Sequence, residues 1–265
     1  MSEVTTDRVE ECRRALDTDG YAVVRGVVSG EGLARFDDML EAEFERFRSS
    51  DAFHGGGMFS GHLNCIPGTA ARFAWDEVNA AGIVDIVKGL NPDWAVRPRA
   101  TLNFNMPGSH AQHYHMDGVY TRDFLICNIA VVDTDIVNGA IDVLPGTNQR
   151  FYRFWQYATQ RIYRGSTRLP LQRGDVVLRR STLWHRGMPN YSDAPRPMLA
   201  FTFGEYDEPV DDPFAGDRAD LEFYPNWFAP TRRGRLRERT FVAAPITYSA
   251  YRFTRSLFSD KGYAH

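Results

Sequence analysis

The chain has few cysteines for its length, with only three among 265 residues. Cys12, Cys65 and Cys127 are scattered, without the close pairing typical of zinc sites or of a disulfide framework. We therefore expect reduced thiols, as in cytoplasmic proteins. No apolar run is long enough to span a membrane, and the N-terminus lacks the pattern of a signal peptide. The sequence thus predicts a soluble, cytoplasmic protein with no membrane partner.

Charge of one sign is not in excess either. The formal net charge of −3 argues against a general nucleic-acid binder. The apolar and charged fractions are those of an ordinary globular protein. At this length a single domain over residues 1–265 is expected if the core is a β-barrel with insertions. It would comprise an N-terminal helical part with one strand (1–95), a barrel core (96–204) and a C-terminal extension (205–265).

Helical spacing of apolar residues marks the N-terminal part. Residues 7–17 and 30–49 show it, and in the second stretch Leu33, Phe36 and Leu40 recur at three or four residues. We expect this helix to pack on the outside of the barrel. Residues 51–70 are rich in glycine and are predicted to be a loop. Residues 76–90 are predicted to resume a helix.

One strand is predicted with particular clarity, over residues 97–106. Polar and apolar side chains alternate there, and a period of two is typical of a strand with two different faces. The apolar face must be covered. The polar face, with Arg97, Arg99, Asn103 and Asn105, faces either solvent or an enclosed cavity. In the second case the two asparagines could meet the oxygens of a cosubstrate or substrate.

The pattern His115-Met116-Asp117 suggests a metal site. Residues two apart on a strand project to the same side, so His115 and Asp117 can converge on one ion. His185 is the best candidate for a third ligand. Two imidazoles and one carboxylate can occupy one face of an octahedral ferrous ion and leave the opposite face open for dioxygen and a chelating cosubstrate.

A cationic side chain follows at a suggestive offset, because Arg196 lies eleven residues after His185. We expect it on a neighbouring strand, where a guanidinium could hold a dicarboxylate by two hydrogen bonds. Arg186 is a rival anchor, although it should point away if its strand is regular. An alternative is that Arg196 lies in a surface turn, between Pro195 and Pro197.

Four segments in the same order resemble the phytanoyl-CoA dioxygenase family of iron(II)- and 2-oxoglutarate-dependent oxygenases. The similarity covers roughly residues 16–203. It is carried by the stretches 16–29 (LDTDGYAVVRGVVS), 138–148 (NGAIDVLPGTN), 173–178 (RGDVVL) and 184–187 (WHRG), together with the metal pattern.

The resemblance implies a mainly β fold with flanking helices, built on a double-stranded β-helix (jelly-roll or cupin-like) core. It implies Fe(II), 2-oxoglutarate and O2 as cofactors, and hydroxylation of a C–H bond as the usual reaction. Gln112 stands where relatives often have a cosubstrate-contacting side chain. Gly187 replaces a common serine, and Thr134 is a candidate to supply the missing hydroxyl. Asp117 fills the position that is Gly or Ala in halogenating relatives, which argues against halogenation.

Other metal sites are open on the residues alone. His113 and His115 could form a cupin-type pair with His185, giving an isomerase or dioxygenase that does not use 2-oxoglutarate. However, the glutamate that such a site needs is missing from the following residues. A zinc hydrolase can also use two histidines and a carboxylate, but it would not need Arg196. A binding barrel without catalysis is the remaining alternative.

The substrate is expected to be a small polar metabolite, such as a secondary metabolite or a sugar derivative. Candidate contacts are His62, Asn64, Arg97, Arg99 and His113. In the C-terminal extension, residues 205–230 are predicted to form a packed extension or a lid. The arginine-rich run 232–239 is predicted to be a solvated face. Aromatic residues near the end suggest a final helix that docks on the core or forms a homodimer.

Overall fold

The structure is a computed structural model, and it describes residues 6–50, 53, 57–96, 99–204, 214, 221–225, 228–229 and 231–259. Its helices are α1 (Thr6–Thr18), α2 (Gly30–Arg48), α3 (Arg72–Ala80), α4 (Ile83–Leu90), α5 (Phe154–Thr159), α6 (Arg232–Ala243) and α7 (Pro245–Phe258). Its strands are β1 (Tyr21–Val24), β2 (His62–Ile66), β3 (Arg99–Asn105), β4 (Leu125–Ala130), β5 (Asp142–Val143), β6 (Thr167–Arg168), β7 (Val176–Arg180), β8 (His185–Arg186), β9 (Arg196–Phe203) and β10 (Glu222–Pro225).

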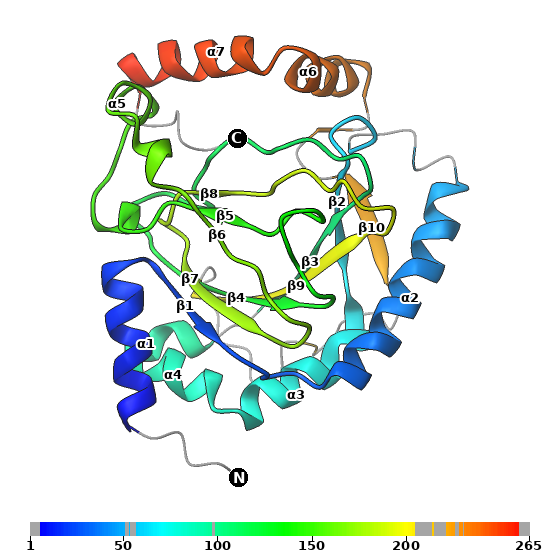
Figure 1. Ribbon diagram of the computed structural model, residues 1–265, viewed down its shortest axis with the longest axis vertical. Helices are drawn as coiled ribbons and strands as arrows, with labels where there is room; N and C mark the ends of the chain where they lie inside the picture. Colours follow the sequence, from blue (N-terminus) through cyan, green and yellow to red (C-terminus); the bar gives the residue numbers. More distant parts are fainter. Residues whose placement is uncertain are drawn as a thin grey trace.

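Two antiparallel sheets form the core. The large sheet has the order β1-β7-β4-β9-β3-β2-β10, and the small one has the order β6-β5-β8. Neighbouring strands in the large sheet are often far apart in sequence, as in the pairing of β3 with β9 from Arg99↔Thr202 to Asn105↔Arg196. The predicted mainly β, jelly-roll type of core with flanking helices is confirmed (Figure 1).

Alternation along the central strands divides the large sheet into two faces. On β9, Leu199, Phe201 and Phe203 belong to the main apolar cluster, which also includes residues of α1 to α4. The intervening residues Arg196, Met198, Ala200 and Thr202 line a cavity instead. β3, β4 and β7 follow the same rule, because successive side chains of a strand point to opposite faces. One face therefore packs on helices, and the other is available for chemistry.

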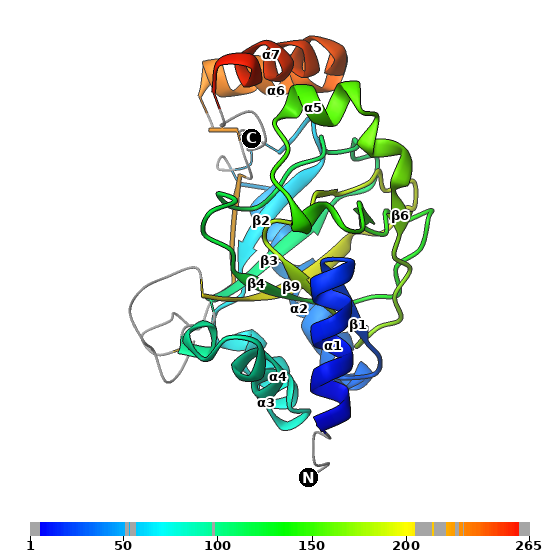
Figure 2. The ribbon, with the colours of Figure 1, turned by 90° about the vertical axis from the view of Figure 1, so that its left-hand side faces the viewer.

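The N-terminal helices build the covered face. In α2, Leu33, Phe36 and Leu40 are buried, and the Ser29 hydroxyl accepts a hydrogen bond from Gly32 N at the helix start. The helix predicted for residues 76–90 is instead two, α3 and α4. Gly82, with φ of +76°, separates them, because this left-handed conformation interrupts a right-handed helix. α3 and α4 lie at the end of the barrel opposite α6 and α7 (Figure 2).

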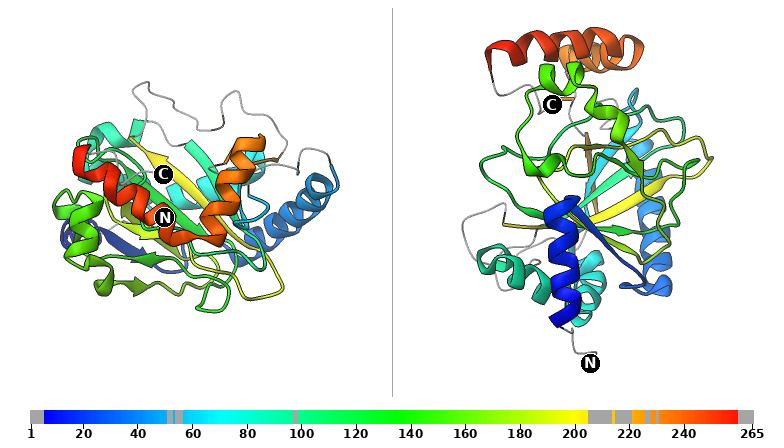
Figure 3. Two further views of the ribbon diagram at one scale, coloured as in Figure 1. Left: turned by 90° about the horizontal axis from the view of Figure 1, so that it is seen from above. Right: turned by 60° about the vertical axis from the view of Figure 1, so that its left-hand side comes forward.

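The last two helices lie across the other end of the barrel, next to α5 (Figures 1 and 3). Two buried charged side chains attach them. Glu238 accepts hydrogen bonds from Gly57 N, Phe59 N, Ser60 N and Ser60 Oγ, while Arg252 donates to Tyr114 O. The run 232–239 is thus a helix with a buried anchor, rather than a uniformly solvated face.

The prediction of a loop over residues 51–70 was also wrong in part, because this stretch contains a strand as well as turns. β2 pairs with β3 on one side and with β10 on the other, and it buries Leu63 and Cys65. The alternating apolar pair Leu63 and Cys65 is too short a pattern for a period of two to be recognised.

Within the described residues, no helix has both the length and the apolar character needed to cross a membrane.

Candidate active site

His115, Asp117 and His185 converge at one end of the cavity. The segment of His115 runs antiparallel to β8, and the backbones of His115 and His185 exchange two hydrogen bonds of 3.0 Å. Asp117 Oδ1 lies 3.6 Å from His115 Nε2, and Asp117 Oδ2 lies 3.6 Å from His185 Nε2. One ligand atom from each of the three lies within 4.8 Å of the others. The spacing is that of donors arranged around a single ion.

The hydrogen bonds of the two imidazoles select the tautomer that a metal requires. Nδ1 of His115 lies 2.8 Å from the carbonyl of His113, and Nδ1 of His185 lies 3.0 Å from the carbonyl of Leu183. A carbonyl oxygen only accepts, so each Nδ1 carries the proton and each Nε2 keeps its lone pair. Both lone-pair nitrogens are those nearest to Asp117.

The protonation states also suit a cation. Burial lowers the pKa of His185 to about 3, with Arg179 as the next cause, and burial lowers that of His115 as well. Burial alone would raise the pKa of Asp117, but Arg179 and the two histidines outweigh it and lower that pKa. At neutral pH the set therefore consists of two neutral imidazoles and one carboxylate, which can bind a metal without losing a proton.

Arg196 faces the same cavity from the large sheet. It is the first residue of β9, whereas His185 lies in the small sheet, so the two are not on neighbouring strands as predicted. The Arg196 side chain is buried, and its Nε has no hydrogen-bond partner in the part of the chain that the structure describes. Burial, followed by the charge of Arg168, lowers its pKa to about 10. A buried cation with a spare donor fits a carboxylate ligand.

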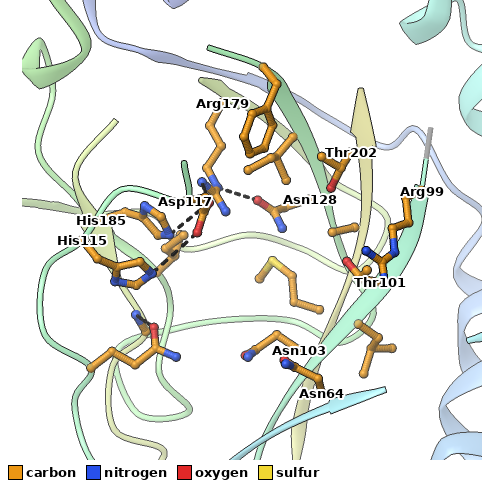
Figure 4. A pocket seen from close by; sticks show the side chains of 18 of the residues that line it. Asn64, Arg99, Thr101, Asn103, His115, Asp117, Asn128, Arg179, His185 and Thr202 are labelled. Atoms are coloured by element: carbon orange, nitrogen blue, oxygen red, sulfur yellow. Dashed lines mark hydrogen bonds and ion pairs between the residues drawn. The ribbon is translucent and has the colours of Figure 1, made fainter. Parts of the chain in front are cut away.

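The cavity, of about 380 Å³, lies between these groups and the polar face of β3. Asn64, Arg99, Thr101 and Asn103 line the side away from the histidines, as Figure 4 shows. The predicted polar face of the strand is therefore the wall of a cavity. Apolar lining comes from Phe124, Ile126, Ile141, Met198 and Ala200.

Three other predicted residues do not line this cavity. Asn105 is buried and donates to Met188 O, and His62 is buried against His110 O at 2.7 Å. Thr134 is buried, and its hydroxyl accepts a hydrogen bond from Leu171 N across the antiparallel bridge between these two residues. Arg97 lies outside the described residues.

His113 faces a second cavity, of about 650 Å³, between α5 and α7. Its ring packs against Phe241 and Tyr248 at centroid distances of 4.6 and 4.9 Å. It is not part of the triad, because the chain between His113 and His115 is not a regular strand. The cupin-type set of three histidines is therefore not assembled. The rival anchor Arg186 also faces this cavity, and it is paired with Asp142.

Gln112 occupies the space that a side chain at position 187 would need. A Cβ at Gly187 would lie 2.9 Å from Gln112 Cδ and 3.0 Å from its Oε1. Gln112 Oε1 also accepts a hydrogen bond of 2.8 Å from Gly187 N. The missing serine of the family pattern is thus matched by a glutamine packed into the same place, and this glutamine lines both cavities.

Several cavity residues were not identified from the sequence, and two of them are polar neighbours of Asp117. Arg179 on β7 and Asn128 on β4 project beside Asp117 (Figure 4). A signal existed for Arg179, because an arginine that ends the apolar run Val176–Leu178 of a buried strand requires a partner. Its partner could not be read from the sequence, since Asp117 lies 62 residues away.

Comparison with models of known protein families identifies the family of this chain. The model of the family described as phytanoyl-CoA dioxygenase (PhyH) matches residues 16–198. The chain belongs to the phytanoyl-CoA dioxygenase family. As a member, it is a non-haem oxygenase that depends on iron and 2-oxoglutarate, which confirms the class and the cofactors expected from the sequence.

Solved structures of similar fold include three proteins that are described as using or binding 2-oxoglutarate (alpha ketoglutarate). The carbocyclase SnoK of nogalamycin biosynthesis is 17% identical, with a TM-score of 0.57, covering 89% of this chain and 90% of SnoK. The epimerase SnoN, in complex with Fe3+, alpha ketoglutarate and nogalamycin RO, is 17% identical, with a TM-score of 0.56 and coverage of 76% and 84%. EctD from S. alaskensis, with 2-oxoglutarate and 5-hydroxyectoine, is 18% identical, with a TM-score of 0.59 and coverage of 80% and 82%.

Proposed function

We propose that His115, Asp117 and His185 hold Fe(II), that Arg196 binds the far carboxylate of 2-oxoglutarate, and that the enzyme hydroxylates a C–H bond of a small polar metabolite. The observation that carries this proposal is the convergence of two Nε2 lone pairs and one carboxylate in a cavity that also contains the buried guanidinium of Arg196, whose Nε has no hydrogen-bond partner among the described residues. Iron, when bound, supplies the activation of dioxygen that is coupled to oxidation of the keto acid. Succinate and CO2 would be the co-products.

The chain's own residues would orient both reactants. Arg196 would fix one end of the keto acid, so that its other end meets the triad. Gln112 would close the cavity beside Gly187, where it is already held by a backbone hydrogen bond. Burial lowers the pKa of both histidines, so at neutral pH each would present an Nε2 lone pair to the iron.

The cavity wall supports a polar substrate. Asn64, Thr101, Asn103 and Thr202 offer hydrogen-bond donors and acceptors on the side away from the triad. A volume of about 380 Å³ is near the lower end for ligand pockets, and it must hold the keto acid as well. The reacting part of the substrate is therefore small. The relatives named as an epimerase and a carbocyclase indicate that this fold does not by itself set the fate of the oxidised carbon.

An anaerobic titration tests the cofactor assignment. Ferrous iron and then 2-oxoglutarate are added to the metal-free protein, and the visible iron-to-keto-acid charge-transfer band is followed. We expect the band in the wild type and its loss in His115→Ala and Arg196→Ala. The exposed His110 and Arg150 supply matched controls, because His110→Ala and Arg150→Ala should retain it. Absence of the band from folded, iron-loaded wild type would refute the proposal.

A succinate-release screen tests the substrate class. Hydroxyl-rich and amine-containing metabolites are compared with apolar molecules of the same size. We expect only the polar set to stimulate succinate release, and Asn103→Leu to reduce that stimulation. Stimulation by apolar compounds alone would contradict the proposed class.

A further inference from the structure

Arg179 links Asp117 to the neighbouring strand. Its Nη1 donates to Asp117 Oδ2 at 2.5 Å, and its Nε donates to Asn128 Oδ1 at 2.8 Å. Only 7% of the side chain is exposed. Figure 4 shows Arg179 between the two acceptors. Asn128 on β4 lies diagonally across from Arg179 on β7, so the sheet itself fixes the direction of the guanidinium.

Arg179 donates its hydrogen bond to one oxygen of the Asp117 carboxylate and makes no hydrogen bond to the other oxygen. Oδ1, the oxygen without this bond, lies 3.6 Å from His115 Nε2, whereas Oδ2, which lies 3.6 Å from His185 Nε2, carries the charge-assisted bond from Arg179. A carboxylate beside a metal can bind through one oxygen or through both. With both, a six-coordinate ion that also held two histidines and a chelating keto acid would have no position left for dioxygen. With one, a position remains open.

We propose that Arg179 is a positioning residue that holds Asp117 as a one-oxygen ligand and so keeps a coordination position available for dioxygen. This inference rests on the proposed function. It assigns a role to a buried cation that does not need to touch either the keto acid or the substrate. A lysine would replace it poorly, because one ammonium nitrogen cannot reproduce the fixed fork that joins Asp117 to Asn128.

The experiment uses full-length Arg179→Met, Arg179→Lys and, as a matched control, Arg180→Met. Arg180 is the next residue of β7 and points to the opposite face, where it pairs with Asp17 and Asp123. Three affinities are measured without oxygen. The first is the affinity of the metal-free protein for ferrous iron. The second is the affinity of the iron form for 2-oxoglutarate, followed by the charge-transfer band. The third is the affinity of the form with iron and 2-oxoglutarate for nitric oxide, which serves as a surrogate for dioxygen.

In Arg179→Met we expect iron to bind at least as tightly as in wild type, because a positive charge beside the site has been removed. The affinity for nitric oxide should fall by roughly 10- to 100-fold, the range in which activity falls when a hydrogen-bonding partner of a metal ligand is lost. Arg179→Lys should give a smaller loss, and Arg180→Met should match wild type in all three affinities.

Two results would overturn the inference. One is wild-type affinity for nitric oxide in folded Arg179→Met. The other is a parallel loss of iron and nitric oxide binding, which would mean that Arg179 only supports the fold of the site. If Arg179→Met does not fold, Arg179→Lys and Asn128→Ala decide by the same criteria. Failure of wild type to form the charge-transfer band is a separate result, and it refutes the proposed function before any variant is compared.

Discussion

Replacing Arg196 by methionine should stabilise the metal-free protein while removing its response to 2-oxoglutarate. Arg196 is 3% exposed, and no described residue accepts a hydrogen bond from its Nε. Burial lowers its pKa from the ordinary range of an arginine to about 10, so the group is still charged at neutral pH. The folded protein therefore carries the cost of a buried cation until an anion arrives.

The size of that cost follows from the pKa. The lowering of the Arg196 pKa to about 10 corresponds to roughly 3 kcal/mol at about 1.4 kcal/mol per pH unit. The group is charged in both the folded and the unfolded state at pH 7, so the whole cost is present there. Methionine has a similar length and no charge. We expect Arg196→Met to raise the free energy of unfolding by about 1–3 kcal/mol, the lower figure allowing for imperfect packing.

The assay is urea unfolding at pH 7, first without metal and then in anaerobic ferrous iron with and without 2-oxoglutarate. At a ligand concentration near 100 times Kd, wild type should gain about 2.7 kcal/mol from the keto acid. Arg196→Met should gain almost nothing. The exposed Arg150 provides a control, since Arg150→Met should change neither quantity.

The reasoning would be refuted by a metal-free Arg196→Met that is clearly less stable than wild type. That result would mean that the metal-free protein already stabilises the buried guanidinium, so that no anionic ligand is needed to offset its burial. An undiminished stabilisation of the variant by 2-oxoglutarate would show instead that the anchor for the far carboxylate lies elsewhere.

Two further predictions concern stability. Glu238→Ala should lower the free energy of unfolding by about 3 kcal/mol or more in urea, because it leaves four donors of residues 57–60 buried without their acceptor, whereas Glu238→Gln, which keeps an acceptor, should lose less. Burial lowers the pKa of His62 to about 4, so between pH 6.5 and 4 the unfolded state binds the extra proton and stability falls as pH falls. Between pH 7 and pH 5 this histidine should account for about 2 kcal/mol of lost stability, a loss that His62→Gln should remove.

Each of these predictions has a control. Arg237→Ala, an exposed change on the same helix as Glu238, should leave stability within about 0.5 kcal/mol of wild type. Equal losses in Glu238→Ala and Arg237→Ala would contradict the anchoring role. For His62 the decisive quantity is the difference between the two proteins in their pH dependence. Identical slopes for wild type and His62→Gln, or a slope that changes equally in the exposed-site variant His110→Gln, would contradict the argument.

Local patterns in the sequence predicted the N-terminal helices and one strand of the cavity wall, β3. The spacing in α2 and the alternation in β3 each report which side chains share a face, and both predictions agree with the structure. They could not say whether the polar face of β3 meets solvent or a cavity, because that depends on which strands pair with it. β2 was missed because its alternating apolar signal is limited to Leu63 and Cys65, and its place in the sheet comes from pairing with β3 and β10.

The sequence by itself determined the family and the chemistry of the donors. Imidazole, carboxylate and guanidinium at His115, Asp117, His185 and Arg196 are properties of residue type, and the order of four motifs is a property of the chain. Only the tertiary structure decided which donors meet. It places His185 and Arg196 in different sheets, turns His113 toward another cavity, and brings Arg179 to Asp117 across 62 residues. The physical reason is that strands far apart in the sequence pair in the sheets. The contacts between their side chains therefore cannot be predicted from the spacing of residues along the chain.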